Sequence, residues 1–140
     1  NGIAIFATNF AKNYDEAFRS RISHHIHFDL PDLDNRIALW SRMFVPQIPL
    51  ADERESFIQA AAEMSEGFSG REIRTCMRLV LPKALLEAEK ASVEPKVSLA
   101  QLQAVISQVK TAKREVASSR KARESRDEID SARSLLGVAE

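Results

Sequence analysis

Glu66-Gly-Phe-Ser-Gly-Arg-Glu-Ile-Arg74 is a glycine-flanked turn that runs directly into a helix. Ser69 and Glu72 have the spacing of a capping box, in which each side chain bonds the backbone N–H of the other residue. Pro82 is expected to kink the helix, because its ring removes a backbone donor. Apolar residues recur at the helical period, which predicts one buried face: Ile73, Cys76, Met77, Val80 and Ala84.

Helical patterns also precede this turn. Asp32 is the expected N-cap of one helix, and Asp52 with Glu55 is expected to open the next. Pro46 and Pro49 end the first of these helices. The two predicted apolar faces are Leu33, Ile37, Trp40 and Phe44, followed by Phe57, Ile58, Ala61 and Ala62.

A fourth helix follows, with Ser98 and Gln101 as its capping pair. Its apolar face is Leu102, Val105, Ile106 and Val109. Four short helices with apolar stripes predict a small bundle over residues 32–109. Beyond it, residues 110–140 are rich in Lys, Arg, Glu, Ser and Ala, and we expect a charged tail that is helical or disordered.

The first 31 residues have the patterns of strands. Residues 3–7 are apolar without alternation, as in a strand covered on both faces of a parallel sheet. Residues 22–30 alternate between apolar and polar side chains, as in a half-covered strand. The predicted fold class is therefore an α/β fragment plus α: two sheet strands in residues 1–31, followed by the helical bundle and the tail.

The overall composition gives only weak indications of the class of protein. Twenty basic and twenty acidic residues give zero formal net charge, so bulk electrostatics indicate neither a polyanionic partner nor a membrane surface. The single cysteine, Cys76, cannot form an internal disulfide, and its position on an apolar face predicts a buried thiol. No apolar run approaches the roughly 20 residues of a membrane span. We therefore expect a cytoplasmic protein without membrane association.

Three short segments place polar groups where a site is expected. Asn9 follows the predicted strand at the end where open α/β sheets bind ligands, although such a residue also suits a turn. Arg19 and Arg21 precede the second predicted strand, where they either stabilise phosphoryl charge or pair with nearby carboxylates. Arg71 stands in the first turn of a helix, where the helix dipole disfavours a cation, or it belongs to a solvated arginine face.

The order and spacing of these segments resemble the AAA+ ATPase family over roughly residues 1–108. Ala7-Thr8-Asn9 looks like the sensor 1 strand end, and Asp15-Glu-Ala-Phe-Arg-Ser-Arg-Ile22 looks like the arginine-finger segment. Phe28-Asp-Leu-Pro-Asp32 with Arg36 resembles the last core strand and its exit into the lid. Gly67-Phe-Ser-Gly-Arg-Glu-Ile73 resembles the lid segment that carries sensor 2.

This resemblance implies a role for each candidate residue. Asn9 would position the attacking water, and Arg21 would reach into the neighbouring subunit's site, with Arg19 as a candidate second finger. Gly70 would admit the adenine and ribose, and Arg71 would bind the phosphates of ATP with Mg²⁺. The implied assembly is a homo-oligomeric ring, a hexamer, that remodels a protein substrate.

The sequence departs from the family in the spacing of its two arginines, with Ser20 where one of them is expected, and more tellingly in an absence. It contains neither a G-x-x-x-x-G-K-[ST] phosphate loop nor an acidic cluster at the end of an apolar strand. The expected function is therefore that of the C-terminal sensor and lid portion of an AAA+ ATPase, without ATPase activity as an isolated fragment. The alternative is a non-enzymatic helical protein-interaction module, and the basic stretch 110–126 makes nucleic acid a less favoured partner of the tail.

Overall fold

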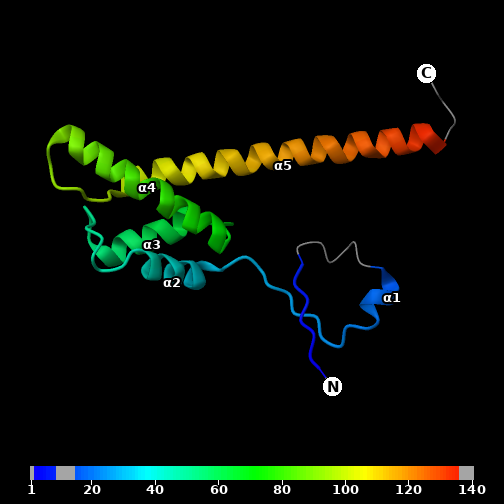
Figure 1. Ribbon diagram of the computed structural model, residues 1–140. Helices are drawn as coiled ribbons and strands as arrows, with labels where there is room; N and C mark the ends of the chain where they lie inside the picture. Colours follow the sequence, from blue (N-terminus) through cyan, green and yellow to red (C-terminus); the bar gives the residue numbers. More distant parts are fainter. Residues whose placement is uncertain (1, 9–14, 136–140) are drawn as a thin grey trace.

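The computed structural model of this chain describes residues 2–8 and 15–135. Its helices in chain order are α1 (Glu16–Arg19), α2 (Leu33–Met43), α3 (Arg54–Met64), α4 (Gly70–Ala91) and α5 (Leu99–Leu135). Figure 1 shows α2, α3, α4 and the start of α5 gathered into one body, with the residues before α2 beside it and the rest of α5 projecting away. The helical bundle therefore contains the glycine-flanked turn, residues 66–74, that runs into α4.

The predicted sheet is absent from the described residues, and that prediction is wrong. Residues 2–8 and 22–31 form no strand, and the described β-pairing is one isolated parallel bridge between Leu50 and Val97. Ile3 and Phe28 are 95% and 87% exposed. A buried parallel strand needs neighbouring strands and helices over its faces, and the described residues provide neither. An alternating or apolar pattern alone does not make a strand without such partners.

The bundle core is built from the predicted apolar faces. Trp40 stacks on Phe44 with ring centroids 5.6 Å apart, and Phe44 meets Phe57 edge to face at 5.0 Å. Such pairs add stabilisation beyond the burial of their area. Leu33 is an exception among the predicted core residues, because it is 38% exposed. The largest fully buried apolar side chains come from all four packed helices and the turn before α4: Trp40, Phe44, Phe57, Phe68, Ile73, Val80 and Leu102.

Local capping signals fixed most helix starts correctly. The side chain of Asp32 accepts a 2.8 Å hydrogen bond from the N–H of Asn35, and Ser69 with Glu72 forms the predicted capping box. The start of α3 was predicted wrongly, because its N-cap is Glu53 rather than Asp52. Asp52 instead accepts a 3.3 Å hydrogen bond from the N–H of Leu99, at the start of α5. Its partner lies 47 residues away, and local spacing cannot indicate that.

A buried arginine fixes the start of the bundle. Arg36 is 8% exposed, and its Nε and Nη1 donate to the carbonyls of Ala62 (2.8 Å) and Pro31 (2.9 Å). Nε1 of Trp40 donates to Oγ of Ser65 over 2.9 Å. These bonds join α2 to the C-terminal end of α3. They also hold the segment that precedes α2 against the bundle.

The last helix is longer than the sequence predicted. We expected four short helices, but α5 has 37 residues and runs without a break from the bundle through most of the charged region. From residue 111 onward, every side chain that the structure describes is exposed. At about 1.5 Å per residue the helix is roughly 55 Å long. No helix among the described residues combines the length and apolar character needed to cross a membrane.

Candidate functional site

The start of α4 is held in place by its turn. Gly67 adopts a positive φ of 74°, a conformation that glycine accepts without steric cost. The following residue, Phe68, is buried and anchors the turn in the core. Ser69 then caps the helix, so that Gly70 and Arg71 are its first two residues. Their backbone N–H groups belong to the first turn, which has no acceptors within the helix.

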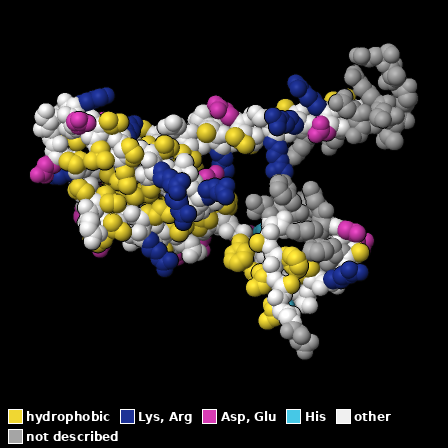
Figure 2. Space-filling model, in the orientation of Figure 1, with side chains coloured by type: hydrophobic (Ala, Val, Ile, Leu, Met, Phe, Trp, Pro, Cys, Tyr) yellow, Lys and Arg dark blue, Asp and Glu magenta, His cyan; other side chains and the backbone are white. Residues whose placement is uncertain are grey.

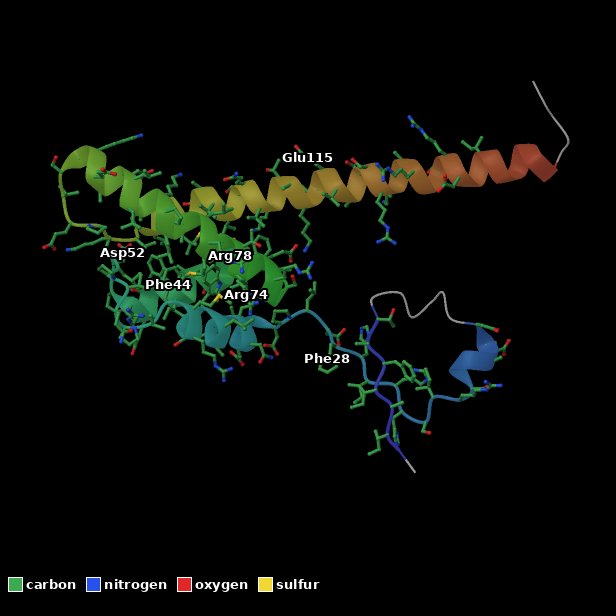
Figure 3. All side chains as sticks on the ribbon, viewed as in Figure 1. Phe28, Phe44, Asp52, Arg74, Arg78 and Glu115 are labelled. Carbon is green, nitrogen blue, oxygen red and sulfur yellow. The ribbon has the colours of Figure 1, made fainter. Side chains whose placement is uncertain are left out.

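An open hollow of about 390 Å³ lies on the outer face of α4 and is lined by Gly70, Arg71, Arg74, Thr75 and Arg78. We call it the basic hollow. Figure 3 labels Arg74 and Arg78 on the α4 ribbon, and Figure 2 shows dark blue side chains on this face of the bundle. Within the described residues, the three guanidinium groups have no ion-pair or hydrogen-bond partner.

Three unpaired arginines beside free backbone N–H groups favour an anionic ligand. Guanidinium groups bind phosphate and carboxylate oxygens in a bidentate manner. The N-terminus of a helix adds a favourable field for negative charge. The arrangement can therefore neutralise several charges of one ligand, and the chemistry that it fits best is that of a chain of phosphates.

A second hollow, of about 520 Å³, adjoins the first. We call it the mixed hollow, because polar and apolar side chains both line it. A Cβ built on Gly70 would have one neighbour, Cδ1 of Leu39 at 4.0 Å, so glycine is not required there by the protein's own packing. Gly70 lines both hollows and joins them. The other residues that line the mixed hollow are His27, Phe28, Asp29, Leu30, Pro31, Asp32, Asn35, Ala38, Leu39 and Arg42.

The structure brings together only some of the predicted site residues. Gly70 and Arg71 share the basic hollow. Asn9 lies outside the described residues. Arg19 is the last residue of α1, and Arg21 follows it with an exposed side chain that bonds no carboxylate among the described residues. Because α1 does not contact the other described helices, this chain does not join Arg19 or Arg21 to the basic hollow.

Sequence reasoning indicated neither the residues before Gly70 that line the mixed hollow nor Lys113 of α5, which lies beside the site. Its Nζ donates to the carbonyl of Gly67 over 2.8 Å and lies 3.0 Å from Oε1 of Glu72. The same Nζ is 5.8 Å from the centre of the Phe68 ring. The helical period of the sequence does indicate Lys113. It continues the stripe on the core face of α5 that contains Leu102, Ile106 and Val109.

Two ionisable groups near the site have shifted pKa values. Burial raises the pKa of Glu72, but hydrogen bonds from the Ser69 backbone and from Lys113 outweigh it and hold this pKa below its usual 4.5. Burial, with the negative charge of Glu72, raises the pKa of the Cys76 thiol to about 11. Glu72 is therefore a carboxylate at neutral pH. Cys76 is a buried protonated thiol, which is not a nucleophile.

The residues around the two hollows fit only part of a Mg-nucleotide. The basic hollow supplies guanidinium and N–H donors for phosphates, and the mixed hollow offers apolar and polar surface for a base and sugar. The described residues contain no group of three or more His, Cys, Asp and Glu side chains that could hold a metal ion. They therefore fit the organic and phosphate parts of a nucleotide and do not fit its magnesium ion.

Comparison with known proteins supports a relationship between this chain and an ATPase subunit. No protein-family model matches the chain. Over 76 residues, 54% of its length, the chain is 36% identical to the katanin p60 ATPase-containing subunit A1 of Strongylocentrotus purpuratus. The match spans only 14% of that relative. The likeness supports an AAA+ ATPase fragment, and it does not extend to individual sensor or lid residues.

Proposed function

We propose that this chain is the C-terminal sensor and lid portion of an AAA+ ATPase that couples ATP binding and hydrolysis to remodelling of a macromolecular substrate. Residues 32–109 form the lid, residues 1–31 carry the sensor 1 and arginine-finger positions, and residues 110–140 are a charged tail. The chain has no ATPase activity by itself in this proposal, because its sequence contains neither a phosphate loop nor the acidic metal-binding motif. The observation that carries the proposal is the unpaired arginine face beside Gly70, and the likeness to an ATPase subunit supports it.

Each lid residue has a distinct role in this proposal. Gly70 stands between the two hollows, so its missing Cβ lets the ribose and base approach the backbone. Arg71 binds the phosphates in the basic hollow, where it has no competing carboxylate among the described residues. The residues that hold magnesium and the remaining phosphates come from other parts of the complete ATPase. The ATP itself supplies the phosphoryl group that is transferred to water.

The N-terminal residues act at a different place. Arg21 is exposed and unpaired among the described residues, which suits a guanidinium that stabilises charge in the site of a neighbouring subunit. Arg19 is the candidate second finger. Asn9 positions the attacking water in the chain's own site. These roles require a homo-oligomeric ring, which we propose to be a hexamer with a protein substrate.

A second function is favoured by the exposed part of α5. Residues 110–126 contain seven basic and two acidic side chains, and from residue 111 onward the described side chains lie on the outside of the projecting helix. Figure 1 shows this part of α5 extending away from the bundle. Such a helix can serve a non-enzymatic interaction module that binds an acidic partner. This second function needs none of the arginines of α4.

Titration of the chain with tripolyphosphate separates the two functions. The readout is the Nε–Hε NMR signal of each arginine, followed in the wild-type chain, in Arg71→Gln and in Arg123→Gln. The first function predicts a saturable shift at Arg71, with a dissociation constant on the order of millimolar. That shift disappears in Arg71→Gln and persists in Arg123→Gln. Shifts confined to α5 arginines would contradict the first function and support the second.

A further inference from the structure

One side chain of α5 reaches across to the turn that carries the site. Nζ of Lys113 donates to the carbonyl of Gly67 over 2.8 Å and contacts both carboxylate oxygens of Glu72, at 3.0 and 3.3 Å. It also lies 5.8 Å from the centre of the Phe68 ring. These contacts span 41 to 46 residues of sequence. Lys113 therefore fastens a distant helix to a turn of four residues, Gly67 to Gly70.

The same carboxylate that holds Lys113 also caps α4. Oε2 of Glu72 accepts hydrogen bonds from the backbone N–H of Ser69 at 2.6 Å and from its hydroxyl at 2.9 Å. Gly70 and Arg71 are the two residues between these partners. The position of the Glu72 carboxylate thus fixes the backbone on either side of the two site residues. Any change in how Lys113 holds Glu72 is transmitted directly to them.

Lys113 also sets the charge beside the basic hollow. Glu72 is a carboxylate two residues from Gly70, and without a counter-charge it would repel a phosphate bound there. Within the part of the chain that the structure describes, Lys113 is the ion-pair partner of Glu72, and its ammonium group balances the carboxylate charge. Lys113 is not among the residues that line the basic hollow. It therefore acts on a ligand without lining the hollow, through its charge and through its hold on Glu72 and the turn.

We propose that Lys113 is a positioning residue for the basic hollow: it holds the Gly67–Gly70 turn and the Glu72 carboxylate so that Gly70 and Arg71 present their donors to a chain of phosphates. This inference rests on the proposed function of the hollow as a phosphate site. It makes the C-terminal helix part of the site without contact with the ligand. A bundle that lacks this contact keeps its core, because Lys113 is an exposed side chain that reaches its partners from outside.

Three variants test the proposal. Lys113→Met keeps an aliphatic chain over Phe68 and removes the ammonium group, whereas Lys113→Arg restores the charge and donors. Lys121→Met is the matched control, because it removes the same charge from an exposed position of α5 with no described partner. All three are titrated with tripolyphosphate, with the Arg71 side-chain signal and the Gly70 amide as readouts.

The expected result is specific to Lys113. Lys113→Met weakens tripolyphosphate binding at Arg71 by about tenfold, the size expected for loss of a charge-assisted contact. Lys121→Met binds within about twofold of wild type, and Lys113→Arg recovers most of the loss. In the ligand-free chain, hydrogen exchange of the Gly70 and Arg71 amides is faster in Lys113→Met than in Lys121→Met.

Two results overturn the proposal in distinguishable ways. If wild type binds at Arg71 and Lys113→Met binds equally well with unchanged amide exchange, Lys113 has no positioning role while the phosphate site stands. If the wild-type chain shows no saturable shift at Arg71, the proposed function of the hollow fails, and this inference fails with it.

Discussion

Oε1 of Glu72 lies 3.0 Å from Nζ of Lys113, which ties the first turn of α4 to the C-terminal helix. Both side chains belong to surface segments, yet the pair is only partly exposed, at 21% for Glu72 and 44% for Lys113. The carboxylate also completes the capping box of α4. The Glu72 carboxylate thus has three roles. It caps α4, it bonds α4 to α5, and its charge is balanced by Lys113 beside the basic hollow.

The first prediction concerns pH. The pKa of Glu72 is lower in the folded chain than its ordinary value of 4.5, so the unfolded chain binds this proton more readily. The contribution to stability is therefore complete above pH 4.5 and is lost as the pH falls through the folded pKa. Urea unfolding of wild type and Glu72→Gln from about pH 6 to about pH 3 measures it. Wild type should be more stable than Glu72→Gln at the upper end, the difference should shrink on acidification, and a constant difference would contradict this.

The second prediction concerns the buried arginine of α2. Arg36→Met keeps much of the side-chain volume but leaves the carbonyls of Ala62 and Pro31 without these donors. We expect the free energy of unfolding to fall by about 2 kcal/mol. Arg42→Met, at an exposed position of the same helix, is the control and should change it by less than about 0.5 kcal/mol. Equal effects of the two variants would show that the bonds of Arg36 are not stabilising.

The third prediction separates stability from ligand binding at Gly70. Because the nearest atom to an added Cβ is 4.0 Å away, Gly70→Ala should leave the melting temperature unchanged or slightly raised. In the complete ATPase that we propose, the same change should raise the Michaelis constant for ATP by about tenfold, because the methyl group enters the space between the two hollows. An unaltered Michaelis constant would remove Gly70 from the nucleotide site.

The fourth prediction concerns the proposed trans arginine. In the complete ATPase, Arg21→Ala should lower kcat by at least about a thousandfold and leave ATP binding nearly intact, because such a group acts on the transition state. Arg19→Ala is the comparison and reports whether a second finger exists. Nucleotide affinity and steady-state turnover are measured on the same preparations. A parallel loss of binding in Arg21→Ala would exclude the trans role.

The fifth prediction separates the two parts of α5. A chain that ends after Arg120 keeps Lys113 and should unfold like the full chain, since the removed side chains that the structure describes are exposed. A chain that ends after Thr111 loses Lys113, and its melting temperature should fall by about 4 °C. Calorimetric unfolding of the two truncated chains compares them directly. Identical melting temperatures would show that the Lys113 contacts do not stabilise the bundle.

Local signals account for what the sequence predicted well. The capping pair Ser69 and Glu72 and the apolar stripe of α4 depend on residues within one or two turns, and the structure has both as predicted. The start of α3 was misassigned because Asp52 bonds the first turn of α5, a contact that depends on the assembled bundle. Lys113 was missed because its contacts also depend on the assembled bundle, although the sequence does place it on the apolar stripe that forms the core face of α5.

The strand prediction failed for a different reason. A strand is stabilised by pairing with other strands, and residues 3–7 form no strand in the part of the chain that the structure describes. The length of α5 was underestimated because its outer part has no apolar face, although Ala, Lys, Arg and Glu are strong helix formers. The candidate site was half predictable: the sequence indicated Gly70 and Arg71 on α4, whereas the mixed hollow appears only when α2 and the chain before it pack beside Gly70.

Isothermal calorimetry with ATP and Mg²⁺ tests whether this chain is the lid portion of an ATPase. The 140-residue chain is compared with a longer polypeptide that extends it upstream through its own gene, and with the Arg71→Gln variant of the longer form. We expect measurable ATP binding by the longer polypeptide, weaker binding by its Arg71→Gln variant, and no heat of binding from the 140-residue chain at micromolar concentration. Absence of ATP binding by the longer polypeptide would contradict the proposed function and leave the interaction module as the function of this chain.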